Sequence, residues 1–148
     1  MTGHVHRDPV RLPDGTVITA VSYFRPNPYA RAREPQYGLY LDRRWQPPWD
    51  HDHLDWPDFG VPADRPVVLS SLRSLMDRAR QGQVVEIGCL GGHGRTGTAL
   101  ALLAVLAGHP RDDAVAWVRN HYCAEAVETR KQSAYVQEDD QGRDQLGS

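Results

Sequence analysis

The sequence predicts a single α/β domain in which a central sheet is flanked by helices. Short runs rich in β-branched and aromatic residues, such as residues 16–24, are typical of strands. Residues 64–81 instead carry apolar side chains at helical spacing. A third observation is the almost wholly apolar stretch within residues 96–107. A helix that is apolar all round is buried on every side, so we expect it at the centre of the fold.

Length and composition agree with one globular domain. The chain has 148 residues, of which 40% are hydrophobic and 24% charged. This length is enough to bury a sizeable core. A formal net charge of −2 and a pI near 6.4 argue against an electrostatic partner such as nucleic acid or a membrane surface. We expect one domain over residues 1–136 and a disordered C-terminal tail over residues 137–148.

The N-terminal third alternates between strands and loops. We expect residues 1–11 to be flexible, and the turn Pro13-Asp14-Gly15 to lead into a strand over residues 16–24. Residues 25–35, rich in proline and arginine, predict an irregular loop. A second strand is expected over residues 37–45, because two prolines within residues 46–50 interrupt the pattern.

Helices and one further strand fill the rest of the chain. The helix over residues 64–81 has Asp64 as its cap, Pro66 in its first turn and Gly82 at its end. A strand over residues 84–87 feeds the apolar helix. Two more helices are expected over residues 111–121 and 124–136, after the break at Gly108 and Pro110.

The most informative stretch is Cys89-Leu-Gly-Gly-His-Gly-Arg95-Thr96, between the strand and the apolar helix. Glycines allow backbone N–H groups to turn inward around an anion, and the helix N-terminus adds its positive dipole end. Arg95 offers a planar fork that matches two phosphate oxygens. Such surroundings favour the thiolate of Cys89, the nucleophilic form. The alternative is a buried structural cysteine beside a glycine-rich turn.

A second segment, Asp55-Trp-Pro-Asp-Phe-Gly-Val-Pro62, lies upstream. A reaction through a phosphocysteine needs a general acid that protonates the leaving oxygen and later activates water. Asp58 suits this role, because it stands on a loop stiffened by Pro57 and Pro62 and hinged at Gly60. Asp50, Asp52 and Asp55 are the alternative carboxylates nearby.

Together these two segments resemble the cysteine-dependent protein tyrosine phosphatases, a superfamily that includes small tyrosine and dual-specificity enzymes. Residues 56–62 resemble the acid loop of that family, and residues 89–96 match its Cys-x5-Arg-Ser/Thr signature. The resemblance implies a three-layer domain with a central sheet flanked by helices. It also implies that Cys89 is the nucleophile, that Asp58 is the acid and that Thr96 stabilises the departing thiolate. The implied phosphate-binding residues are Leu90, Gly91, Gly92, His93, Gly94 and Arg95.

A third segment, Val127-Glu-Thr-Arg-Lys-Gln132, resembles the glutamine loop of the family. Gln132 falls on the glutamine that orders the hydrolytic water, whereas Glu128 stands where another glutamine is usual. A charged Glu128 would repel phosphate, so either its pKa is raised or its side chain points elsewhere. The alternative interpretation of this segment is a solvated helix face. A further departure is Gly88, at the position where the family usually has a histidine.

The expected function is phosphomonoester hydrolysis through a phosphocysteine, by a protein tyrosine or dual-specificity phosphatase. The alternatives are a small-molecule, phosphoinositide or RNA phosphatase, or a catalytically weak phosphate-binding module. Expected substrates are phosphorylated proteins or small phosphomonoesters, and no cofactor or metal is expected. His51-Asp52-His53 gives an alternative metal site, which we do not favour because no compact further ligand set is evident. The oligomeric state stays open.

Cysteine usage and the start of the chain suggest a cytoplasmic protein. No apolar segment reaches transmembrane length, and His4, Arg7 and Asp8 interrupt any secretory signal. Two cysteines, Cys89 and Cys123, give no disulfide framework. Cys123 is expected to be a small apolar filler, and its alternative role is to protect an oxidised Cys89 as a disulfide.

Overall fold

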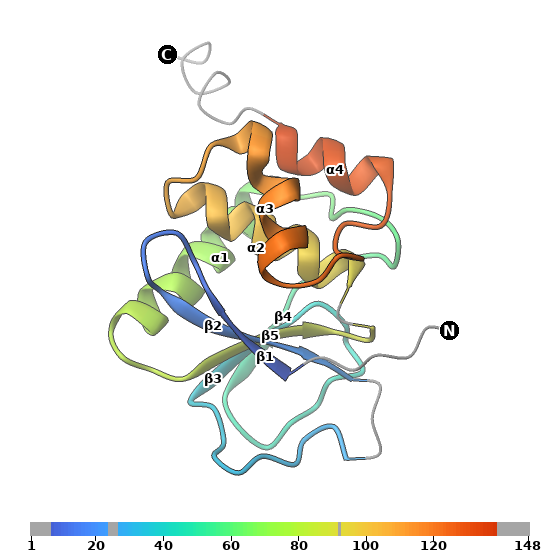
Figure 1. The fold of residues 1–148 in the computed structure, drawn as a ribbon. Helices are drawn as coiled ribbons and strands as arrows, with labels where there is room; N and C mark the ends of the chain where they lie inside the picture. The colour runs from blue at the N-terminus through green and yellow to red at the C-terminus, as the bar shows by residue number, and fades with distance from the viewer. Residues whose placement is uncertain (1–6, 24–26, 92, 139–148) are drawn as a thin grey trace.

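The structure is a computed structural model that describes residues 7–23, 27–91 and 93–138. Figure 1 shows a twisted sheet with the helices gathered on one of its faces. The strands are β1 (Arg7–Arg11), β2 (Val17–Ser22), β3 (Tyr37–Tyr40), β4 (His51–His53) and β5 (Val85–Cys89). The helices are α1 (Arg65–Arg80), α2 (Gly94–Leu106), α3 (Ala114–His121) and α4 (Arg130–Gln137), and a short 3₁₀ turn, η1 (Arg111–Asp113), precedes α3.

Strand β5 is the middle strand of the five-stranded sheet, whose order is β1-β2-β5-β3-β4. It runs parallel to both of its neighbours, β2 and β3, and only the β1–β2 pair is antiparallel. All five residues of β5 are buried, as expected for a parallel strand covered on both faces. The carboxyl ends of β2, β5 and β3 therefore meet at one edge of the sheet, where parallel α/β sheets bind their ligands.

Helix α2 is the centre of the helical layer. Every residue from Gly94 to Ala104 is buried, which confirms the prediction of a central apolar helix. The other three helices all contact it. Gly97 permits one close approach, because a Cβ at this position would lie 2.5 Å from the Cβ of Ala126. The first turns of α2 are thus held rigidly between the sheet and the segment that leads into α4.

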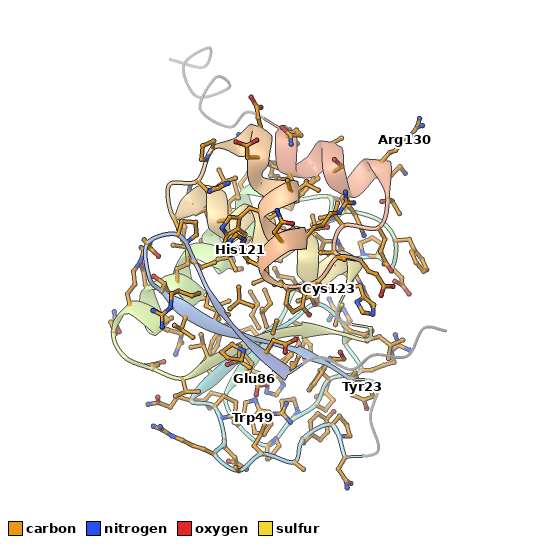
Figure 2. All side chains as sticks on the ribbon, viewed as in Figure 1. Tyr23, Trp49, Glu86, His121, Cys123 and Arg130 are labelled. Atoms are coloured by element: carbon orange, nitrogen blue, oxygen red, sulfur yellow. The ribbon has the colours of Figure 1, made fainter. Side chains whose placement is uncertain are left out.

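A layer of aromatic and charged side chains covers the opposite face of the sheet. In Figure 2, Glu86 and Trp49 lie on the side of the sheet away from His121 and Cys123. The Glu86 carboxylate accepts a hydrogen bond from Arg31 Nε at 2.6 Å and another from the Tyr40 hydroxyl at 3.0 Å. Trp49 Nε1 donates to the Tyr40 hydroxyl at 2.8 Å. The sheet lies between helices and this loop layer, so the prediction of an α/β three-layer domain is confirmed.

The caps of α1 follow the sequence prediction. Asp64 is the N-cap, and its side chain accepts a hydrogen bond from the backbone N–H of Val67. Pro66 lies in the first turn, where its missing N–H costs nothing. Gly82 follows the helix with a φ of +92°, a conformation that favours glycine. Within the described ranges, no helix is long and apolar enough to cross a membrane.

Two predictions for the N-terminal third are wrong. Residues 7–11, expected to be flexible, form edge strand β1, which pairs with β2 from Arg7↔Val21 to Arg11↔Val17. Residues 1–6 lie outside the described residues. The strand expected over residues 37–45 ends at Tyr40, because the Asp42 carboxylate accepts the backbone N–H of Arg44 and closes a turn.

The C-terminal helices also begin later than predicted. Residues 111–113 form a 3₁₀ turn before α3, and the helix expected from residue 124 begins at Arg130. Thr129 caps it in a capping box with Gln132, and Val127 has a φ of +62°, which a helix does not allow. Helix α4 ends at Gln137, inside the tail predicted over residues 137–148, of which residues 139–148 lie outside the described residues.

Candidate active site

Residues 89–95, here called the phosphate loop, join the end of β5 to α2. Cys89 is the last residue of β5 and is 2% exposed. The backbone N–H of Tyr23 donates to the carbonyls of Cys89 and Leu90, both at 3.1 Å, and the Ser22 hydroxyl donates to the Gly91 carbonyl. These bonds tie the loop to the end of β2, while the N-terminus of α2 brings its positive dipole end to the same place. Gly92 lies outside the described residues.

Arg95, in the first turn of α2, is held so that part of its guanidinium group stays available. Nη1 donates to the carbonyls of Leu41 at 3.0 Å and Trp56 at 3.3 Å, and Nη2 lies 3.3 Å from Asp42 Oδ2. A guanidinium has five N–H groups. Three are used in these bonds, which leaves for other partners one N–H of Nη2 and the Nε–H, whose nitrogen lies 3.7 Å from Asp58 Oδ1.

Asp42 is a site residue that the sequence analysis missed. Its side chain is 6% exposed and contacts two arginines, Arg95 and Arg44. Hydrogen bonds from Arg44, with the positive charges of Arg44 and Arg95, lower the pKa of Asp42 to about 2 against the opposing effect of burial. Asp42 therefore stays ionised and fixes the orientation of Arg95. No sequence signal marks it, because Asp42 falls inside the strand expected over residues 37–45.

Asp58 stands on the acid loop, defined here as residues 55–62. Its Oδ1 lies 3.7 Å from Arg95 Nε, and its side chain is 54% exposed. Trp56 Nε1 donates to the Gly60 carbonyl at 2.9 Å, and the Gly60 N–H donates to the Pro57 carbonyl at 3.0 Å. Phe59 adopts a φ of +60° at the tip of the loop. These bonds present Asp58 to the phosphate loop.

Two of the three alternative carboxylates near the acid loop have partners away from Arg95. Asp52, on β4, accepts a hydrogen bond from the Tyr37 hydroxyl at 2.6 Å, and Asp55 is an exposed partner of Arg43. His51 and His53 lie within hydrogen-bond distance of the backbone carbonyls of Trp49 and Trp45. Because His51 and His53 alternate with Asp52 along β4, the strand points Asp52 to the other face. The structure therefore does not bring His51, Asp52 and His53 together as a metal site.

Gln132 joins the acid loop to the start of α4. The side chain is fully buried, and its Oε1 accepts the backbone N–H groups of Glu128 at 2.8 Å and Thr129 at 3.3 Å. Its Nε2 donates to the Gly60 carbonyl at 3.3 Å. The solvated-face alternative is therefore wrong for Gln132, because its amide lies inside the site and contacts the acid loop.

Glu128 points toward the phosphate loop. A Cβ on Gly94 would collide with the Glu128 carboxylate, which accepts a hydrogen bond from the Gly94 N–H. Burial raises the pKa of Glu128, and so do the negative charges of Asp58 and Glu125, while Arg95 opposes this shift. Of the two explanations offered by the sequence, the raised pKa is the one that the structure supports.

Two further residues of the stretch from Cys89 to Thr96, Thr96 and His93, differ in their hydrogen-bond partners. Thr96 is fully buried, and within the described part of the chain its hydroxyl has no hydrogen-bond partner. An unsatisfied buried hydroxyl costs about 1–3 kcal/mol, so a thiolate at the base of the loop would be a suitable acceptor. His93 is half-buried, and its Nδ1 lies 3.5 Å from Cys123 Sγ.

Comparison with known proteins decides the family. The family model described as protein-tyrosine phosphatase matches residues 44–141, which include the acid loop, the phosphate loop and Gln132. The chain belongs to the protein-tyrosine phosphatase family. The family resemblance predicted from the two sequence motifs is thereby confirmed.

Solved phosphatase structures share this fold. Tk-PTP in its active form is 25% identical, with a TM-score of 0.70 over 86% of this chain and 92% of the other. Kinase-associated phosphatase is 16% identical, and the match has a TM-score of 0.73 and covers 100% of this chain and 99% of the other. P. aeruginosa TpbA is 21% identical, with a TM-score of 0.65 over 88% and 84%.

Curated sequences add two uncharacterized proteins of Methanocaldococcus jannaschii. They are 37% and 36% identical over 83 and 81 residues, or 55% and 53% of this chain. The matches cover 53% and 48% of the two relatives. The chain therefore spans about half the length of the curated relatives it matches.

Gly88 departs from the pattern of the phosphatase family for a steric reason. A Cβ at this position would lie 2.6 Å from Val21 Cγ2 and 2.7 Å from the Val21 carbonyl oxygen. The oxygen belongs to the backbone of β2, which pairs with β5 at this point. Any side chain at position 88 would therefore displace the neighbouring strand, and glycine is the residue that fits.

Glu128→Gln should tighten anion binding at neutral pH. Because the Glu128 pKa is raised, the charged form appears, and sulfate affinity falls, as pH rises through that value. We expect roughly fivefold tighter sulfate binding in the variant, a modest Coulomb effect for a carboxylate that solvent partly screens. The measurement is the sulfate inhibition constant between about pH 5 and pH 8, where sulfate stays dianionic.

The matched control for Glu128→Gln is Glu34→Gln, on the exposed loop between β2 and β3. This control should retain the sulfate affinity and pH dependence of the parent. Unchanged sulfate binding in Glu128→Gln at every pH would contradict a charged carboxylate beside the phosphate loop.

Gln132→Ala should destabilise the domain by about 1–3 kcal/mol, because it removes a fully buried amide and leaves the N–H of Glu128 without its acceptor. Thermal or urea unfolding measures the change. Gln137→Ala, an exposed position on the same helix, is the control and should be nearly neutral. Equal stabilities for the two variants would show that the Gln132 hydrogen bonds contribute nothing.

Proposed function

We propose that this member of the phosphatase family hydrolyses phosphomonoesters through a phosphocysteine formed on Cys89. The observation that carries the proposal is the approach of Asp58 Oδ1 to within 3.7 Å of Arg95 Nε. An acid thus stands beside the group that would hold phosphate, and the buried Cys89 begins the loop that carries this arginine. A phosphate-binding module without catalysis has no need of a carboxylate there.

In the first step the Cys89 thiolate attacks phosphorus in line, and the bond from phosphorus to the leaving oxygen breaks. The two remaining donors of Arg95 and the backbone amides of the phosphate loop, other than the Gly94 N–H that Glu128 accepts, hold the other phosphate oxygens. Protonated Asp58 gives its proton to the leaving oxygen. The products of this step are the free alcohol or phenol and the phosphocysteine.

In the second step water attacks phosphorus and the phosphorus–sulfur bond breaks. Asp58, now ionised, takes a proton from the water, and Gln132 holds the acid loop that carries Asp58 by donating to the Gly60 carbonyl. The Thr96 hydroxyl donates a hydrogen bond to the departing Cys89 thiolate. Inorganic phosphate leaves, and Asp58 is again protonated for the next turnover.

We propose protein tyrosine or dual-specificity substrates for this reaction. Phe59 is 60% exposed at the tip of the acid loop, where an aromatic ring of a substrate can pack against it. P. aeruginosa TpbA, which shares the fold, has been solved in complex with pTyr. His93, which as a cation would favour polyphosphates, instead has Nδ1 beside Cys123 Sγ. The thiolate chemistry suits a reducing compartment, so we propose the cytoplasm as its location.

A substrate panel tests the proposal. Purified protein is assayed with an aryl phosphate, phosphotyrosine and phosphoserine peptides, an inositol polyphosphate and a 5′-phosphorylated RNA. We expect turnover of the aryl phosphate and the highest kcat/KM on phosphotyrosine peptides. Higher kcat/KM on the inositol phosphate or RNA would favour the small-molecule or RNA alternative. Binding of phosphate without turnover of any substrate would favour the alternative of a catalytically weak phosphate-binding module.

A further inference from the structure

A second group of reactive side chains lies beside the phosphate loop and takes no part in the hydrolysis. His93 directly precedes α2, while Cys123 and Glu125 lie on the segment between α3 and α4. Figure 2 shows Cys123 on the helical side of the sheet. His93 Nδ1, Cys123 Sγ and a Glu125 carboxylate oxygen all lie within 4.8 Å of one another. In the ranges that the structure describes, this is the one group of three such residues.

The distance between nitrogen and sulfur fits a shared metal ion. Zn²⁺ binds sulfur at about 2.3 Å and imidazole nitrogen at about 2.05 Å, so tetrahedral geometry separates the two ligand atoms by about 3.6 Å. His93 Nδ1 and Cys123 Sγ are 3.5 Å apart. Glu125 is exposed, and one of its carboxylate oxygens lies within 4.8 Å of both atoms.

The charges around Cys123 also favour a cation. The side chain is buried, and the negative charges of Glu125 and Asp8 act on its sulfur. Burial and these two negative charges raise the pKa of Cys123, and hydrogen bonds from the backbone N–H groups of Glu125 and Ala126 oppose the shift. A bound cation would offset the negative charges of the two carboxylates beside this sulfur. Thiolate and imidazole ligands select Zn²⁺ over Mg²⁺ or Ca²⁺.

We propose that His93, Cys123 and Glu125 bind a Zn²⁺ ion, with a water molecule as the fourth ligand. On binding, the Cys123 thiol releases its proton to solvent, and Sγ, Nδ1 and one carboxylate oxygen coordinate the metal. The ion links the phosphate loop to the segment that carries Glu128. The ion has a structural role: it holds these two segments together and takes no part in the hydrolysis.

Direct titration with Zn²⁺ tests this site without an assay of activity. The background is Cys89→Ser, which removes the other thiol and leaves the proposed ligands intact. We expect one Zn²⁺ per chain, a higher Tm in the presence of Zn²⁺, and with Co²⁺ a sulfur-to-metal charge-transfer band. Adding Cys123→Ser should abolish all three effects. Glu125→Gln should weaken binding, whereas Glu34→Gln, at an exposed position outside the site, should not change it.

Two results would overturn the proposal. One is a Cys89→Ser protein that binds no Zn²⁺, which would mean that Nδ1 and Sγ share only a hydrogen bond. The other is equal Zn²⁺ affinity with and without Cys123, which would place the ion elsewhere. Far-ultraviolet circular dichroism checks folding of each variant. If Cys123→Ser does not fold, the exposed Glu125→Gln variant decides, and unchanged affinity in it counts against the site.

Discussion

Cys89→Ser should abolish phosphomonoester turnover, by roughly 10⁴-fold or more, as expected when a covalent nucleophile is lost. A serine hydroxyl has almost the same shape as the thiol but is barely ionised at neutral pH. The phosphate loop should keep its form, because the bonds from Tyr23 and Ser22 reach backbone carbonyls rather than the Cys89 side chain.

Affinity for phosphate separates loss of the nucleophile from loss of the site in Cys89→Ser. Arg95 keeps its contacts with Leu41, Trp56 and Asp42, so the donors that hold the anion are unchanged. We expect calorimetry to give phosphate binding close to that of the parent. Activity near the parental level would show that Cys89 is not the nucleophile. Loss of phosphate binding would show that the substitution disturbs the phosphate loop.

Asp58→Asn should lower kcat by about 10²–10⁴-fold on substrates whose leaving oxygen must gain a proton. A strongly acidic phenol leaves as its anion and hardly needs the acid, whereas a tyrosyl or alkyl oxygen does. The loss in rate should therefore grow steadily with the pKa of the leaving group. A series of substituted phenyl phosphates measures this slope.

Asp55→Asn is the matched control for Asp58→Asn. Asp55 lies three residues earlier on the same loop, is exposed and contacts Arg43 rather than Arg95. It should show the parental leaving-group slope. A slope that steepens in Asp55→Asn and stays parental in Asp58→Asn would reverse the assignment of the acid.

Local chemistry explains why the sequence predicts much of this site. Cys89, Arg95 and Asp58 stand in short segments where glycines permit tight backbone turns and prolines fix the backbone, and both are local signals. The caps Asp64 and Gly82 are equally local signals, and both occur where predicted. Asp42 is different, because its role depends on Arg95, which is remote in sequence. Nothing near Asp42 distinguishes it from an ordinary loop carboxylate.

Two wrong predictions about the fold, for residues 7–11 and 124–129, share a physical cause. Strand β1 forms because its backbone pairs with β2 through hydrogen bonds. Its sequence, with Pro9 at the centre, does not by itself predict a strand. Residues 124–129 have helical composition, but Val127 has a positive φ and Gln132 captures the N–H groups of Glu128 and Thr129. Tertiary contacts thus outweigh local preference in both segments.

The fit of Gly88 against β2 has an evolutionary consequence. A histidine at position 88 would need β2 to move, because a Cβ there meets the Val21 carbonyl oxygen at 2.7 Å. No single substitution at position 88 can therefore restore the usual residue without disturbing the central pair of parallel strands. A lineage that carries this glycine has to tune the reactivity of its cysteine through other positions, and a protein engineer would have to redesign both strands together.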